Sequence, residues 1–368
     1  MAYLAQVPVV VGSVLANRDI RRVQLAFVAF NAGEWGVWIA MLVYAYERGG
    51  STTAGLVALA QLVPASLFAP LAARLADRRR PGRVLAGGYF VQAAALGATA
   101  AMLIASGPPV LAYALAAVAA TAVTVTRPAQ AALLPSLART PDELTATNVV
   151  GGWSESISML AAPALAGVLL AWHGAGAVFA VMSVVLLCAA LLVAPVAGTA
   201  PAPADDNAGA FRLLFHLPNA RLLVGVLGAQ YLVIGALDVL FVVLAVSVLD
   251  HDGSVAGYLN AAFGAGGVVG IVVTVALVGR SRLVPPLVAG VVAWSAAFVV
   301  LAARPSLVAA LVLLACAGAG RSLLDVAGRT LLQRTVPADV LARMFGVLEG
   351  ISMAGLAASG GYYVSCAG

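Results

Sequence analysis

The chain has 368 residues, of which 62% are hydrophobic and only 10% are charged, and its mean hydropathy is +1.03. A water-soluble domain is closer to half apolar and a quarter charged, so this composition excludes a soluble globular protein and predicts a membrane protein. The net charge of +5 comes from arginines at the ends of apolar segments, not from a basic stripe with interleaved aromatic residues. We therefore expect no nucleic-acid partner.

The residues that most often build metal or catalytic centres are few and scattered. The three cysteines and three histidines are Cys188, Cys316, Cys366, His173, His216 and His251. None has metal-ligand spacing, and the cysteines are typical of small apolar fillers. The sequence thus predicts no enzyme, no metal site and no cofactor.

Apolar segments follow one another along almost the whole chain. A helix needs about 20 apolar residues to cross a bilayer. Residues 1–15 lack a basic start and a cleavage site, so they are interpreted as an interfacial lead-in and not as a signal peptide. Eleven candidate spans follow, at residues 21–46, 53–75, 84–106, 109–130, 143–171, 175–195, 221–249, 254–279, 283–303, 305–333 and 339–364.

The arginines orient these spans. If the N-terminus is cytoplasmic, seventeen of the twenty arginines fall on the cytoplasmic side, Arg127 and Arg329 among them. Only Arg48 and Arg304 fall on the other side, and Arg321 lies within a span. Such a bias is typical of multi-pass membrane proteins, whose cytoplasmic loops are rich in arginine.

The spans divide into two halves. A polar stretch that contains Pro201, Pro203, Asp205 and Asp206 separates the sixth span from the seventh. The pentapeptide that begins at Glu155 (ESISM) also recurs 194 residues later, at Glu349 (EGISM). The two copies lie in spans five and eleven, and an even number of spans between repeats predicts parallel repeats related by an axis along the membrane normal. We expect a bundle at 1–196, a cytoplasmic linker at 197–219, and a second bundle at 220–368 that ends after its fifth span and lacks a twelfth.

The loop between spans two and three carries a family motif. Residues 73–83 hold five arginines and one aspartate, a density that excludes this loop from hydrocarbon. Asp77, Arg78, Gly82 and Arg83 match the loop motif of the major facilitator superfamily of secondary transporters, although two extra residues separate Arg78 from Gly82. The resemblance implies an all-α fold of two parallel six-helix bundles. It also implies that these four residues latch one conformation, with Asp77 at the N-terminus of the eleventh span.

Two further segments narrow the resemblance. The segment from Asn31 to Trp38 (NAGEWGVW) resembles a bacterial subgroup of efflux carriers, some of which carry a C-terminal cyclic-nucleotide-binding domain. In span five, Pro163 and Gly167 match part of the antiporter pattern. The resemblance implies a monomeric, proton-coupled efflux antiporter of the bacterial cytoplasmic (inner) membrane.

Four of the acidic residues within spans are candidate functional groups, because an ionisable group there costs roughly 2.5–3.5 kcal/mol on insertion scales. Glu34 lies near the midplane of span one, on a helix that lines the central cavity in the resembling family. Asp238 lies deeper along span seven, and the resemblance implies that Glu155 and Glu349 fall on helices that meet between the halves. These acids are candidates for binding a proton or a cationic substrate, and Glu155 and Glu349 are alternatively a structural pair.

Polar and aromatic neighbours complete the candidate site. Trp35 and Trp38 are candidates for stacking on an aromatic or cationic substrate, with packing or lipid contact as the alternative. Asn31 and Gln230 are polar candidates on spans one and seven.

Two further patterns concern helix contacts. In span ten, Arg321, Asp325 and Arg329 follow one another at i, i+4 and i+8, which predicts a charge ladder on one helix face. The glycines of span eight predict close helix packing.

The sequence thus predicts a proton-coupled exporter of a small lipophilic or cationic compound that works by alternating access. Its partners would be that compound, protons and the bilayer. The alternatives are proton-coupled uptake of a metabolite, and a non-transporting membrane sensor linked to a C-terminal ligand-binding domain.

Overall fold

The computed structural model describes residues 7–196, 198, 218–244, 248–249, 254–303 and 306–366, and these residues form helices and connections without a strand. The helices are α1 (Val7–Ala16), α2 (Arg18–Arg78), α3 (Pro81–Ile104), α4 (Pro109–Leu137), α5 (Pro141–Val193), α7 (Pro218–Val243), α8 (Ser254–Val275), α9 (Val284–Ala303), α10 (Leu307–Thr335) and α11 (Ala338–Cys366). The predicted all-α fold is confirmed.

Two of these helices each contain two predicted spans. α2 breaks at Gly49 and Gly50, where Gly50 has φ 65°, and α5 breaks at Gly174, where φ is 74°. A positive φ strains residues that carry a Cβ atom but not glycine. The chain therefore reverses direction at these glycines, and each of the eleven predicted spans coincides with a helical segment.

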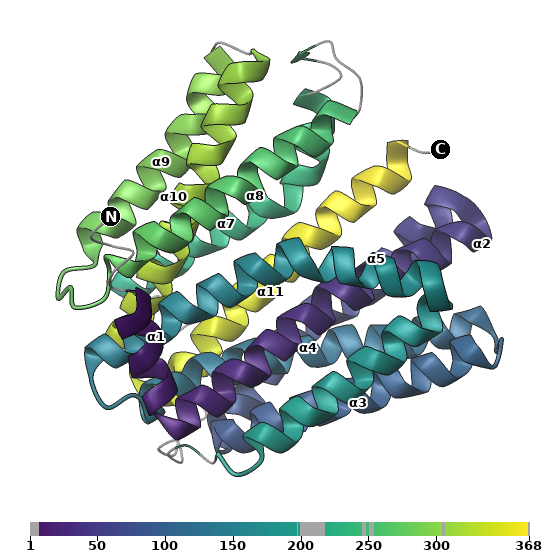
Figure 1. Ribbon diagram of the computed structural model, residues 1–368, viewed down its shortest axis with the longest axis horizontal. Coiled ribbons are helices and arrows are strands. Elements are labelled where there is room, and N and C mark those ends of the chain that lie inside the picture. Colours follow the sequence, from purple (N-terminus) through teal and green to yellow (C-terminus); the bar gives the residue numbers. More distant parts are fainter. Residues whose placement is uncertain are drawn as a thin grey trace.

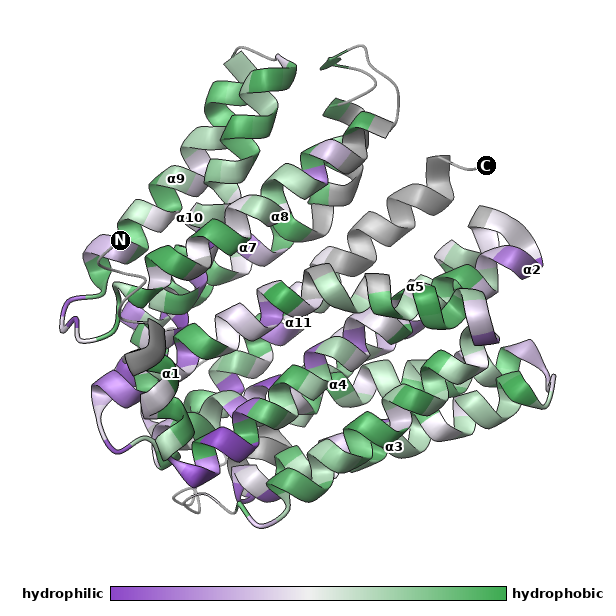
Figure 2. Cartoon of the chain, in the orientation of Figure 1, coloured by the Kyte–Doolittle hydropathy of each residue, from purple (hydrophilic) through white to green (hydrophobic). Residues whose placement is uncertain are grey.

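The helices have the composition of membrane spans. Eight segments of the described chain are long and apolar enough to cross a bilayer, and the apolar part of α7, Pro218–Ile234, is shorter. Figure 2 shows hydrophobic residues along most of α3 and α9, and hydrophilic residues gathered where helices end near α1.

The helices form two groups that meet at one end of the molecule (Figure 1). α2 packs mainly on α5, α4 and α11, whereas α10 packs mainly on α8 and α9. We call the end that carries Asn17 and the α2–α3 and α4–α5 connections the Asn17 end, and the opposite end the Gly50 end. In Figure 1, α8, α9 and α10 diverge from α2–α5 toward the Gly50 end.

Side-chain hydrogen bonds join the two groups at the Asn17 end. Asn148 of α5 donates to Thr330 at 2.9 Å and to Gln333 at 2.6 Å, both on α10. Arg334, near the end of α10, donates to the hydroxyl of Thr145 at 2.6 Å. These bonds hold α5 against α10, so this end of the molecule is closed.

The N-terminal lead-in is a short helix. α1 packs on α5 and α2. Asn17 then caps α2: its side-chain oxygen accepts from the backbone N–H groups of Asp19 and Ile20. Its side-chain amide donates to the Leu137 carbonyl at 3.1 Å and to Glu143 at 2.9 Å. One side chain therefore ties the start of α2 to the α4–α5 connection.

The cytoplasmic placement of Arg127 and Arg329 was wrong. α4 continues beyond residue 130, through Pro128 and Pro135, to Leu137, and α10 continues to Thr335. Both arginines therefore lie inside helices, away from the connections.

Several predicted features fall on residues that the structure does not describe. The linker at 197–219 lies almost entirely outside the described residues. The side chains of Asp77 and Arg78 are likewise outside the described part, although both residues belong to α2. Gly82 and Arg83 begin α3, where Gly82 is buried and Arg83 is exposed.

Candidate functional site

A central cavity of about 180 Å³ lies between the two groups of helices. Its walls come from α2, α3, α4, α5, α7, α10 and α11. The charged residues that line it are Glu34, Arg127, Glu155, Arg321, Arg329 and Glu349. The cavity thus brings together three acids that were predicted as site residues and three arginines.

Arg127 is the centre of this charged cluster. Nη2 of Arg127 lies 2.6 Å from Oε2 of Glu34. Its Nε lies 3.7 Å from Oε1 of Glu349, and its Nη1 lies 3.9 Å from Oε1 of Glu155. The Arg127 side chain is only 14% exposed. One guanidinium on α4 therefore faces carboxylates from α2, α5 and α11.

A second cluster continues the charged network on α10. Arg329 lies 2.9 Å from Asp325, and it also donates to the hydroxyl of Tyr231 on α7. That hydroxyl in turn donates to Asp325 at 3.0 Å. Arg321 does not continue a ladder toward Asp325: it forms an ion pair with Glu155, at 3.8 Å. The i, i+4 pair Asp325–Arg329 is present, and Arg321 turns instead toward α5.

The network carries an excess of negative charge. It contains four carboxylates (Glu34, Glu155, Glu349 and Asp325) and three guanidiniums (Arg127, Arg321 and Arg329). With every group ionised, the described cluster therefore has a net charge of −1. A buried charge without a partner is costly, and the three guanidiniums do not balance all four carboxylates of this cluster.

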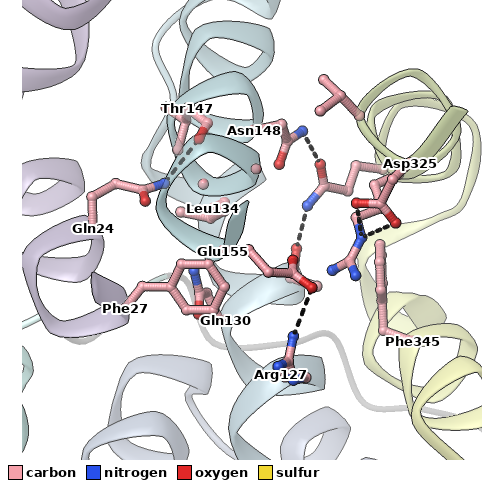
Figure 3. A pocket seen from close by; sticks show the side chains of 16 residues that line it. Gln24, Phe27, Arg127, Gln130, Leu134, Thr147, Asn148, Glu155, Asp325 and Phe345 are labelled. Atoms are coloured by element: carbon pink, nitrogen blue, oxygen red, sulfur yellow. Dashed lines mark hydrogen bonds and ion pairs between the residues drawn. The ribbon is translucent and has the colours of Figure 1, made fainter. Parts of the chain in front are cut away.

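A smaller polar cavity of about 40 Å³ lies between the network and the Asn17 end. Figure 3 shows Arg127 and Glu155 at one side of it, and Gln24, Thr147 and Asn148 at the other. Gln24 donates to the Thr147 carbonyl at 3.0 Å. Polar side chains are therefore present between the charged cluster and the closed end.

The other candidate residues differ in their positions. Trp35 and Trp38 line the central cavity next to Glu34. Asn31 is completely buried and Gln230 is 2% exposed, and neither lines the described cavities. Asp238 belongs to α7, but its side chain lies outside the described part of the structure. The site is therefore built mainly around Glu34, Glu155 and Glu349.

One feature of the sequence points to the depth of Arg127 in the membrane. Arg127 lies ten residues before the end of α4, which is about 15 Å at 1.5 Å per residue and half of a ~30 Å hydrocarbon layer. The predicted end at residue 130 hid this depth. Proline is tolerated inside membrane helices because neighbouring helices satisfy the freed backbone groups. A span extended through Pro128 and Pro135 would have placed Arg127 at this depth.

The comparisons with known proteins agree with this geometry. The family model described as "Major Facilitator Superfamily" matches residues 24–360. A comparison with curated protein sequences finds no match. A crystal structure of a bacterial homologue of the iron transporter ferroportin, in the outward-facing state, has a TM-score of 0.76 and 18% identity over 94% of each chain.

Two other solved structures share the fold with different cargo. The human organic anion transporter MFSD10 (TETRAN) has a TM-score of 0.64 and 15% identity, over 96% of this chain and 94% of that one. The proton:xylose symporter XylE, bound to 6-bromo-6-deoxy-D-glucose, has a TM-score of 0.64 and 12% identity, over 96% and 88%. Identities this low show the fold alone. With a family model matching nearly the whole chain, this protein belongs to the major facilitator superfamily of membrane transporters.

Proposed function

We propose that this protein is a proton-coupled secondary transporter that exports a small lipophilic or cationic compound by alternating access. The observation that carries the proposal is the buried cluster around Arg127, in which four carboxylates face three guanidiniums. A cluster with one surplus negative charge can hold a proton or a cationic substrate, and the two would compete for it. Competition of this kind is the simplest basis for exchange.

The ion pairs also link the site to movement of the helices. Arg127 of α4 contacts Glu349 of α11, and Glu155 of α5 contacts Arg321 of α10. Both pairs join a helix that precedes residue 197 to one that follows residue 219. Protonation of Glu155 or Glu349 would weaken these links, and the two groups of helices would then separate more easily. We propose these groups as the two bundles, 1–196 and 220–368, with 197–219 as their linker.

The orientation follows from the arginines that remain at helix ends. We propose that the Asn17 end is cytoplasmic, in a bacterial inner membrane, because most arginines fall at that end. The bonds from Asn148 and Arg334 close this end, and the described conformation is then open to the outside. The outward-facing state named for the ferroportin homologue supports this interpretation. We retain Asp77, Arg78, Gly82 and Arg83 as the proposed conformational latch of a monomeric carrier.

The cavity walls support a substrate that is partly apolar. Trp35 and Trp38 lie beside Leu62 and Leu96 in the lining, and tryptophan faces attract cations as well as apolar rings. A flat, lipophilic cation would satisfy both the aromatic walls and the surplus negative charge. A neutral sugar would leave that charge without a partner.

The deciding experiment is proton flux in proteoliposomes. Wild-type protein is reconstituted with a pH-sensitive dye inside, and a panel of lipophilic cations is added against an imposed proton gradient. We expect substrate-dependent proton movement that is lost in Glu34→Gln and Glu155→Gln. Glu47→Gln is the matched control, since Glu47 is an exposed acid near the Gly50 end of the same helix.

Each other outcome points to a different function. Proton flux unchanged in Glu34→Gln and Glu155→Gln would overturn the assignment of the coupling site. Flux in which proton and substrate move in the same direction would establish the uptake alternative. Tight binding of the cations without any flux would favour the sensor.

A further inference from the structure

A second, wider groove lies outside the central site. It has a volume of about 880 Å³ and is formed by the second part of α2, the start of α3, and α4. α3 packs closely against α4 and α5 but much less against α2. The weak contact between α2 and α3 leaves this groove on the flank of the molecule, where a membrane protein meets lipid.

The groove is apolar along its length and strongly basic at one end. Pro64, Phe68, Val91 and Val118 contribute to its walls. The hydroxyl of Thr121, the only polar wall side chain among the described lining residues besides the arginines, bonds within α4 to the Ala117 carbonyl at 2.8 Å. The walls thus offer no polar partner to a ligand and fit a hydrocarbon chain.

Three arginines mark the other end. Arg79, Arg80 and Arg83 line the groove at the Asn17 end, and all three are exposed. Residues 73–83 as a whole have an excess of four positive charges. α3 also begins here without a side-chain cap at Arg80, and the N-terminus of a helix attracts anions.

The dimensions match one leaflet of the bilayer. From Pro81 to Val91, α3 extends for ten residues, or about 15 Å at 1.5 Å per residue. Half of a ~30 Å hydrocarbon layer has the same thickness. We propose that this groove binds an anionic phospholipid of the leaflet at the Asn17 end, with its phosphate at Arg79, Arg80 and Arg83 and an acyl chain between α2, α3 and α4.

This assignment concerns a lipid site and does not depend on the proposed transport function. Lipid bound here would contact Pro64 and Phe68 of α2 together with Arg79, Arg80 and the first turn of α3. It would therefore stabilise the α2–α3 connection against movement. A zwitterionic lipid of the same chain length fits the walls equally well but gains less from the arginines, so headgroup charge is the distinguishing variable.

The test is lipid retention by the full chain in detergent, measured by native mass spectrometry after addition of dioleoyl phosphatidylglycerol or dioleoyl phosphatidylcholine. We expect wild type to retain phosphatidylglycerol in preference to phosphatidylcholine. In R79Q/R80Q/R83Q the affinity should fall by about fivefold per arginine, or on the order of 100-fold in total. R18Q/R280Q/R282Q is the matched control, because these arginines are also exposed and lie at the same end.

A second variant blocks the apolar part without changing charge. A Cβ atom at Gly87 would meet no atom within 4 Å, so Gly87→Leu would project its side chain into the groove without disturbing α3. We expect this variant to lose retained phosphatidylglycerol while it elutes as a monodisperse species. The Gly87→Leu variant therefore tests the lipid site even if the triple arginine variant proves too unstable to purify.

Three results would overturn the proposal. Equal retention of the two lipids by wild type would mean that the arginines do not select a headgroup. Retention of phosphatidylglycerol by Gly87→Leu at the wild-type level would place the lipid elsewhere on the protein surface. Displacement by inorganic phosphate alone would identify a soluble anion, and not a lipid, as the occupant.

Discussion

Nη2 of Arg127 lies 2.6 Å from Oε2 of Glu34, and the contact joins residues 93 positions apart on α4 and the first part of α2. The same guanidinium also faces Glu155 and Glu349. One guanidinium therefore forms ion pairs with carboxylates from three other helices. This dependence of several buried acids on one base makes Arg127 the most sensitive position in the protein.

Replacing Arg127 should destabilise the protein strongly. Arg127→Gln leaves the buried carboxylates of Glu34, Glu155 and Glu349 without their common partner, and removing one member of a buried pair costs about 3–5 kcal/mol. The melting temperature in detergent should fall, and Arg127→Gln combined with Glu34→Gln should recover part of the loss. Arg18→Gln, at an exposed position, should melt like wild type. An unchanged melting temperature for Arg127→Gln would contradict the central role of this side chain.

The bonds that close the Asn17 end should control access to the smaller polar cavity. Gln130 lines that cavity and is 5% exposed. In a background without native cysteines, Gln130→Cys should react slowly with a maleimide, and Arg334→Gln or Asn148→Ala should accelerate the reaction. Both substitutions remove hydrogen bonds between α5 and α10.

The rate of thiol labelling measures this opening directly. Thr335→Ala is a suitable control, since the Thr335 hydroxyl donates to the Leu331 and Leu332 carbonyls, which both belong to α10. If Arg334→Gln and Asn148→Ala label no faster than the control, the closed end does not depend on these bonds.

Close packing between α8 and α10 should make two nearby glycines respond in opposite ways. A Cβ atom at Gly266 would collide with the Ala315 carbonyl of α10, whereas one at Gly264 would meet nothing within 4 Å. Gly266→Ala should therefore destabilise the protein by about 1–3 kcal/mol. Gly264→Ala should leave the melting temperature unchanged or raise it, because alanine favours the helix. Equal melting temperatures for the two variants would show that α8 and α10 do not approach this closely.

The cap at Asn17 should contribute to stability through two separate functions. Asn17→Ala removes the acceptor for the N-terminus of α2, which costs about 1 kcal/mol, and also the bonds to Leu137 and Glu143. Asn17→Asp keeps the acceptor but loses the donor and adds a charge beside Glu143. We expect both variants to melt below wild type, and the Asp variant to recover as the pH is lowered enough to protonate the facing carboxyl groups. A pH-independent difference between Asn17→Asp and wild type would contradict the contact with Glu143.

Features that depend on neighbouring residues could be predicted from the sequence, whereas contacts between distant residues could not. The breaks at Gly49–Gly50 and Gly174 were predictable from local glycine placement, and so was the approximate place of the spans, although α4 continues to Leu137, beyond its predicted end at residue 130. The i, i+4 pair Asp325–Arg329 follows from helix geometry alone. In contrast, the partner of Arg321 is Glu155, 166 positions earlier in the chain, and nothing local indicates it. The glycines of α8 illustrate the same limit, because only the position of α10 distinguishes Gly266 from Gly264.

By itself, the sequence determined the membrane-spanning helices, their breaks and the intramembrane acids Glu34, Glu155 and Glu349. These depend on hydropathy, length and glycine content, which are properties of contiguous residues. Only the tertiary structure decided that these acids converge on Arg127 and that Arg79, Arg80 and Arg83 head an apolar groove. Such relationships depend on how each helix is rotated and where it crosses its neighbours, and packing between residues far apart in the chain sets both.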